Sequence, residues 1–300
     1  MVLSEDKCRS IWSFEKIFGG SGKAPKEHAI PWAKVCDWVV CITTKAAEKK
    51  RWPFLKKALQ EADLARLTSI MLNKKPCDME GTDCDLLDGC FASHCCAIQQ
   101  AQMSGIRRVL VLEDDVYFDV PKLRRAVGAC LEFLKADLDF SAFLFGGVYT
   151  EMQATSISGV FSGKGVQAHC WLINVRHPVW NAAANSGFRM ADMYNHERGL
   201  TYMIHPGVAF QRDFSRGETA KSRPVYNLEE FPPLYRTLTE LGMRFGMRNC
   251  WEGCARKTNS LVYKTGSIKA AVISLGVVVG VLLSVIVTMA CCWATWAQKK

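Results

Sequence analysis

Residues 106–115 read IRRVLVLEDD, an apolar run that ends abruptly in three acidic residues. Consecutive apolar side chains without polar alternation are typical of a strand that is buried on both faces, as in a parallel sheet. Gly105 is expected to end the helix before this strand, and Pro121 to begin the helix after it. The unit therefore predicts an α/β fold.

The same alternation of strand and helix recurs along the chain. Further strands are expected at 37–44, 64–72, 140–145, 167–175 and 200–204. One helix is expected to begin at Pro53, and another to be capped by Asp88. Residues 150–165 are rich in Ser, Thr and Gly, have no apolar period and are expected to form a mobile loop. These elements predict a parallel or mixed sheet with helices on both faces.

The composition narrows the class of protein. The chain has 300 residues, of which 49% are hydrophobic and 22% are charged, so it is not a disordered protein. A net charge of +9 favours an anionic small molecule or an anionic lipid surface as partner. No basic and aromatic pattern of a nucleic-acid reader is visible, so no nucleic-acid partner is expected. Residues 1–20 carry several charges, so no signal peptide is expected, and the 14 cysteines are therefore expected to be reduced thiols.

Residues 270–298 contain no charged side chain and are dominated by Val, Ile, Leu, Ala and Gly. A helix of about 20 such residues spans a bilayer, so a single C-terminal membrane anchor is predicted. More basic residues precede this span than follow it, which places the main body in the cytosol. The expected segments are an N-terminal extension at 1–36, the main domain at 37–254, a linker at 255–269 and the span at 270–298.

Polar residues follow three of the expected strands. Thr43, the acids 113–115 and the pair Gly146-Gly147 all lie where a strand ends, and ligands of open α/β sheets bind at that edge. Adjacent carboxylates repel each other, and a divalent cation removes this penalty. Glu113 and Asp115 share a face of an extended chain, with Asp114 pointing away, and their oxygens suit Mg²⁺ or Mn²⁺, which could hold a diphosphate. The alternative is an acidic loop that caps the next helix.

These residues resemble a known family. GCFASH (residues 89–94), a helix and then VLVLEDDV (residues 109–116) resemble the signature of glycosyltransferase family 25, which includes bacterial lipooligosaccharide glycosyltransferases and collagen galactosyltransferase domains. Weaker similarities, in chain order, are residues 39–42 with Arg51, residues 168–173, Asp192, and His205-Pro206 with Gln211. The resemblance covers about residues 37–212. The family's closing Ser-Asp-Ile is missing after Gln211, where this chain continues with Arg212-Asp213.

The resemblance implies a glycosyltransferase A-type, Rossmann-like fold and transfer of a hexose, galactose or glucose, from a nucleotide sugar such as UDP-hexose. The acceptor would be a glycan, a lipid or a protein, and the cofactor Mn²⁺ or Mg²⁺. Glu113 and Asp115 would bind the metal, and Asp115 and Asp192 would be catalytic. The residues expected to bind the nucleotide sugar are Thr43, Arg51, Ser93, His94, Glu113, Asp114, Gly146, Gly147 and Gln211.

Each of these assignments has an alternative. Arg51 has the alternative of an exposed helix arginine, Asp192 that of a helix cap, and Ser93-His94 that of a hydrogen-bonded pair at a helix start that orients the acidic loop. His169 and His205 are weaker candidates, because an isolated histidine in a strand is usually only hydrogen-bonded. For the whole chain, the alternatives are a catalytically degenerate binding or adhesion module of the same fold, and a structural membrane protein whose acids are incidental.

Overall fold

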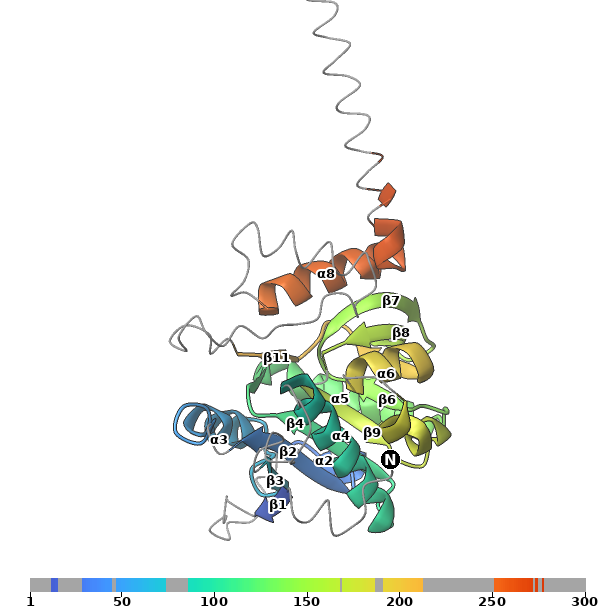
Figure 1. Cartoon of the computed structure of the whole chain (residues 1–300). Coiled ribbons are helices and arrows are strands. Elements are labelled where there is room, and N and C mark those ends of the chain that lie inside the picture. The colour runs from blue at the N-terminus through green and yellow to red at the C-terminus, as the bar shows by residue number, and fades with distance from the viewer. Residues whose placement is uncertain are drawn as a thin grey trace, which may run out of the picture.

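The computed structural model describes residues 12–15, 29–44, 47–73, 86–167, 169–186, 191–212, 251–271, 273–274 and 277 (Figure 1). Within these ranges the chain forms one nine-stranded sheet and one two-stranded sheet. Helices cover the large sheet, which confirms the predicted mixed α/β architecture. The glycosyltransferase A-type assignment stays a prediction.

The large sheet has the strand order β1-β3-β2-β4-β9-β6-β10-β8-β7. Its strands are β1 (Trp12–Glu15), β2 (Trp38–Thr44), β3 (Thr68–Asn73), β4 (Arg108–Glu113), β6 (Ala142–Leu144), β7 (Val148–Ala154), β8 (Val160–Val166), β9 (Cys170–Asn174) and β10 (Thr201–Ile204). β3, β2, β4, β6 and β10 point the same way, and β9 runs antiparallel between β4 and β6. The carboxyl ends of β2 and β4 therefore lie side by side.

Helices pack on both faces of this sheet (Figure 1). On one face lie α2 (Trp32–Val35), α3 (Trp52–Glu61) and α5 (Val120–Lys135). On the other lie α4 (Leu86–Met103), the 3-10 helix η3 (Pro178–Asn185), α6 (Ala191–Arg198) and α8 (Trp251–Thr265). β4 supplies both cores, with Leu110 and Leu112 on the first face and Val109 and Val111 on the second. This division explains why the strand has no polar alternation.

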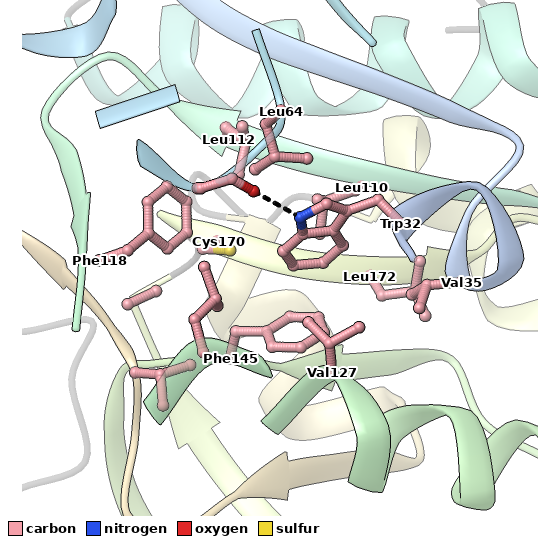
Figure 2. Packing of buried hydrophobic residues seen from close by; sticks show 14 of the residues in the cluster. Trp32, Val35, Leu64, Leu110, Leu112, Phe118, Val127, Phe145, Cys170 and Leu172 are labelled. Atoms are coloured by element: carbon pink, nitrogen blue, oxygen red, sulfur yellow. Dashed lines mark hydrogen bonds between the residues drawn. The ribbon is translucent and has the colours of Figure 1, made fainter. Parts of the chain in front are cut away.

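The first core is centred on a buried tryptophan (Figure 2). Trp32 is fully buried, and its ring packs edge-on against Phe145. Its indole N–H donates a 2.8 Å hydrogen bond to the carbonyl oxygen of Ala62, at the end of α3. A buried indole needs such a partner. The segment before β2, predicted as an N-terminal extension, thus contributes a central side chain to the core.

The C-terminal helix α8 also contacts the sheet, at β7. The side-chain oxygen of Asn259 accepts from the Tyr149 N–H at 2.8 Å, and its amide nitrogen donates to the Gly147 carbonyl at 2.9 Å. The helix therefore runs across the predicted boundary at residue 254. Among the residues that the structure describes, no helix combines the length and apolar character that a membrane crossing requires. The predicted span at 270–298 lies largely outside those residues.

The prediction of a mobile loop at 150–165 is wrong, because β7 and β8 form an antiparallel hairpin there. The side chains of Tyr149 and Met152 are buried against the rest of the sheet. At Gly163, φ is +155°, and a Cβ atom would lie 2.1 Å from the Glu151 carbonyl oxygen. The glycine that made the segment look irregular is therefore what allows the two strands to pair closely.

Two smaller expectations concern Asp88 as a helix cap and the state of the cysteines. Asp88 is not the N-cap of its helix, since α4 already includes Leu86. Six cysteines are buried in the described part of the chain, and their expected reduced state stays a prediction. They are Cys36, Cys41, Cys95, Cys96, Cys130 and Cys170.

Candidate functional site

The three acidic residues lie where β4 leaves the sheet. In the parallel register Ile42 of β2 pairs with Glu113 of β4, so Thr43 and Asp114 follow on adjacent strands. Glu113 is the last residue of β4, and the chain then turns through residues 114–115 into β5 (Val116–Phe118). The predicted edge of the sheet thus brings the threonine and the acids together.

Asp114 is held by partners on both of its oxygens. Thr43 Oγ1 donates to Asp114 Oδ2 at 2.6 Å, and Arg51 Nη1 lies 2.8 Å from Asp114 Oδ1. Trp52 Nε1 in turn donates to Thr43 Oγ1 at 3.0 Å. The Asp114 side chain is only 8% exposed, so this pairing offsets much of its desolvation. Asp114 thereby connects the N-terminus of α3 to β2 and β4. Arg51, whose side chain is 30% exposed, is not the exposed helix arginine of the alternative.

Glu113 is oriented from two other elements. His94 Nε2 lies 3.2 Å from Glu113 Oε1, and Gln211 Nε2 donates to Glu113 Oε2 at 3.1 Å. Burial raises the pKa of Glu113, but the hydrogen bond and charge of His94, with smaller contributions from His169 and Gln211, outweigh it and leave that pKa below its ordinary value. The side chain is therefore a carboxylate at neutral pH, 22% exposed and fixed in direction.

Asp115 differs from both neighbours. Its Oδ1 is shielded from solvent and has no hydrogen-bond partner among the residues described. Burial raises the pKa of Asp115 well above its usual range, the charges of Glu113 and Asp114 raise it further, and Arg51 lowers it. A shielded oxygen without a partner is costly, so the chain places here a group that needs a ligand or a proton.

A small second sheet forms one wall of the site. β5 pairs antiparallel with β11 (Ala209–Gln211), which carries Gln211 to Glu113. Gly146 allows β11 to approach, because a Cβ atom there would lie 1.8 Å from the Ala209 carbonyl oxygen. The same carbonyl lies 3.1 Å from Nε2 of buried His169, whose pKa is lowered chiefly by burial. In this arrangement Gly146 acts through packing, and its predicted contact with a nucleotide sugar stays a prediction.

Three other predicted residues are placed by local structure. Asp192 lies in the first turn of α6, and its Oδ2 accepts a 2.7 Å hydrogen bond from the backbone N–H of Gln167. Gln167 has a positive φ of 75°, so Asp192 stabilises an uncommon backbone conformation just before β9. Ser93 is fully buried within α4 rather than at its start. At Gly147 a Cβ atom would lie 2.6 Å from the Val166 carbonyl oxygen.

The assignment of Glu113 and Asp115 as metal ligands stays a prediction. Among the described residues there is no cluster of three or more His, Cys, Asp or Glu placed to hold a metal. Mg²⁺, however, is commonly held by one or two carboxylates together with waters and substrate phosphates. Each carboxylate oxygen has two lone pairs, so the bonds from His94 and Gln211 leave Glu113 able to bind a cation beside Asp115. The unpartnered Asp115 Oδ1 is the observation that favours such a ligand.

The sequence analysis missed two residues at this site. Trp52 orients Thr43 through its indole N–H. Arg212 donates its backbone N–H to the carbonyl oxygen of Asp115 at 2.8 Å, which extends the β5–β11 pairing. The position of Trp52 directly after Arg51 is a usable signal, since both begin one helix. For Arg212 the sequence gives no such signal, since it stands out only where the chain departs from the family's closing motif.

Comparisons with known proteins give no family. No protein-family model matches this chain, and neither does any curated protein. Solved structures that resemble it include a protein from STIV, with 12% identity and a TM-score of 0.36 over 59% of this chain and 86% of that one. A glycosyltransferase involved in glycosylation of the major capsid of PBCV-1 has 10% identity and a TM-score of 0.29 over 54% and 74%.

A UDP-glucose pyrophosphorylase complexed with UDP-glucose has 8% identity and a TM-score of 0.33 over 58% of this chain and 75% of that one. Similarity this low carries no argument about activity. The resemblance to family 25 therefore rests on the motifs alone, and the chemistry of the site has to be argued from its own residues.

Proposed function

We propose that this chain is a glycosyltransferase that moves a hexose from a nucleotide sugar, UDP-hexose in the first instance, to a glycan, lipid or protein acceptor. The observation that supports it best is the partnerless, shielded Oδ1 of Asp115, at the carboxyl end of a buried strand and next to the oriented carboxylate of Glu113. Adjacent, partly buried carboxylates repel each other, and a bound cation would relieve this repulsion. The cation could in turn bind a diphosphate.

The reaction requires stabilisation of a leaving diphosphate. The bond between the sugar's anomeric carbon and the diphosphate oxygen breaks, with the electron pair leaving on that oxygen. The oxygen of an acceptor hydroxyl forms the new bond to the anomeric carbon, and its proton passes to a base, for which Asp192 is the candidate. Asp115 and Glu113 would hold Mn²⁺ or Mg²⁺, and the ion would supply Lewis-acid stabilisation of the leaving group. His94 and Gln211 keep Glu113 in a fixed direction, and this fixed direction reduces reorganisation during the reaction.

Asp114 has a supporting role in this proposal. Its pairing with Arg51 and Thr43 fixes the turn between β4 and β5, and Asp115 is the next residue in that turn. Asp192, bound to the backbone before β9, remains our candidate for the acceptor side. The proposal also places the body in the cytosol, anchored by the segment at 270–298.

A donor screen tests the function. The full-length chain in detergent is incubated with UDP-glucose, UDP-galactose and other nucleotide sugars, with Mn²⁺ or with EDTA, and release of the nucleoside diphosphate is measured. We expect release from one donor class, abolished by EDTA and restored by excess Mn²⁺. Binding of UDP without any release would instead identify the degenerate binding module, and absence of both would reject the nucleotide-sugar site.

A further inference from the structure

An arginine at the rim of the acid cluster is held by aromatic rings. The guanidinium carbon of Arg212 lies 4.8 Å from the ring centroid of Phe54 and 5.6 Å from that of Tyr117. Phe54 belongs to α3, and Tyr117 belongs to β5, two residues after Asp115. The backbone N–H of Arg212 is bonded to the Asp115 carbonyl oxygen. Main chain and side chain are thus both fixed beside the acidic turn.

The other arginines near the site have carboxylate partners. Arg51 is paired with Asp114 at 2.8 Å, and Arg256 of α8 lies 3.5 Å from Asp119 while stacking over Phe210. For Arg212 the structure describes ring contacts and no ion pair with any carboxylate in the described part of the chain. This is notable because three carboxylates belong to the turn to which its own main chain is bonded.

Stacking on rings leaves the hydrogen-bonding edge of a guanidinium available. The planar faces contact the aromatic rings, whereas the N–H groups point outward in the guanidinium plane. Those N–H groups form the fork that binds phosphate oxygens in a bidentate manner. Phe54 is 46% exposed, and Arg212 is exposed as well, so the rings hold the cation in contact with solvent rather than burying it.

We propose that Arg212 forms an anion-binding site that takes the diphosphate of the nucleotide sugar, beside the carboxylates proposed to hold the cation. This inference rests on the proposed function and assigns to Arg212 the role that the sequence analysis gave to Arg51. Arg51 is neutralised by Asp114, whereas the positive charge of Arg212 remains available to an anion. Arg212 and the cation would then both supply positive charge to the leaving diphosphate.

The test compares binding of UDP, uridine and inorganic pyrophosphate by calorimetry, using the full-length protein with Mn²⁺ and the Arg212→Ala and Arg212→Lys variants. Arg107→Ala is the matched control, because Arg107 lies just before the opposite end of β4 and its side chain makes an exposed 3.7 Å pair with Asp137. We expect Arg212→Ala to weaken the binding of UDP and of pyrophosphate about 10-fold or more and to leave the binding of uridine unchanged. Arg212→Lys should give a smaller loss, and Arg107→Ala none.

The outcomes separate this inference from the proposed function. Equal affinity of Arg212→Ala and wild type for UDP and pyrophosphate overturns the inference and leaves the function standing. An equal loss for uridine and UDP also overturns it, because Arg212 then does not recognise phosphate. Binding of pyrophosphate that depends on Arg212, without binding of UDP, supports the anion site and rejects the nucleotide sugar. An unchanged thermal midpoint of Arg212→Ala shows that weaker binding is not caused by unfolding. If the alanine variant unfolds, the binding of Arg212→Lys decides instead.

Discussion

Asp114 and Asp115 are adjacent in the chain but have opposite surroundings. Both oxygens of Asp114 have partners, in Thr43 and Arg51, whereas Asp115 Oδ1 is shielded and has none among the described residues. The first carboxylate therefore stabilises the fold. The second destabilises it unless a proton or a ligand is bound, because burial and the neighbouring charges both disfavour its ionised form.

This contrast indicates that the two aspartates have different roles, one in stability and one in ligand binding. A carboxylate that stabilises the fold has its hydrogen-bond partners within the protein, so removing it should lower stability. A carboxylate that binds a ligand lacks such a partner until the ligand is bound, so removing it should lower activity and leave stability unchanged. Substitutions at the two positions should therefore have opposite effects, and this opposition is measurable.

The largest effect is expected for Asp115→Asn. The amide is close in size to the carboxylate but cannot provide an anionic oxygen to a cation, so donor turnover should fall about 100-fold or more. The thermal midpoint without ligand should stay the same or rise, because a neutral amide avoids the burial cost and the repulsion from Glu113 and Asp114 that disfavour an ionised Asp115. Release of nucleoside diphosphate and thermal unfolding measure the two quantities.

The control for this variant is Asp137→Asn, at an aspartate whose side chain is 89% exposed. It should alter neither turnover nor midpoint. Full turnover in Asp115→Asn would refute the metal role, and a large drop in its midpoint would show that Asp115 serves the fold as Asp114 does.

The second effect is expected for Asp114→Ala, on stability. Removing the carboxylate leaves Arg51 and the Thr43 hydroxyl without their acceptor in a largely buried setting. Loss of one partner of a buried pair costs about 3–5 kcal/mol, and we expect about 2–3 kcal/mol here because the Arg51 side chain is 30% exposed. Urea unfolding followed by circular dichroism measures it, and a loss below about 0.5 kcal/mol, as for a typical surface substitution, would contradict the assignment.

Much of this edge of the sheet is predictable from the sequence. The uninterrupted apolar run before Glu113 reflects burial of β4 on both faces, and the β2 strand ending at Thr44 follows from the same pattern. Such patterns involve only neighbouring residues, so they can be recognised from the sequence alone. The gathering of Thr43 and the three acids at one edge then follows from the parallel arrangement.

The partners of each acid are not predictable in the same way. Asp114 and Arg51 are 63 positions apart, and their pairing depends on how α3 leaves β2. The glycines mislead for a similar reason. Gly146 and Gly163 look like loop or ligand-binding residues, whereas both permit close approach of backbone from a distant or neighbouring strand. Packing distances of this kind leave no periodic trace in a single sequence.

The smallest effect is expected for Thr43→Val, which tests whether Asp114 acts as one unit with its partners. The valine keeps the shape of the side chain but removes the donor to Asp114 and the acceptor of Trp52 Nε1, so we expect a loss of about 1–2 kcal/mol. In the double variant with Asp114→Ala the losses should not add, because both remove the same hydrogen bond. Thr68→Val is the matched control: Thr68 is also buried in a neighbouring strand, but its hydroxyl donates to the Leu64 carbonyl, and its loss should add fully to that of Asp114→Ala. Additive losses for Thr43 and Asp114 would mean that the two residues stabilise the turn separately, and the contrast between Asp114 and Asp115 would then rest on Arg51 alone.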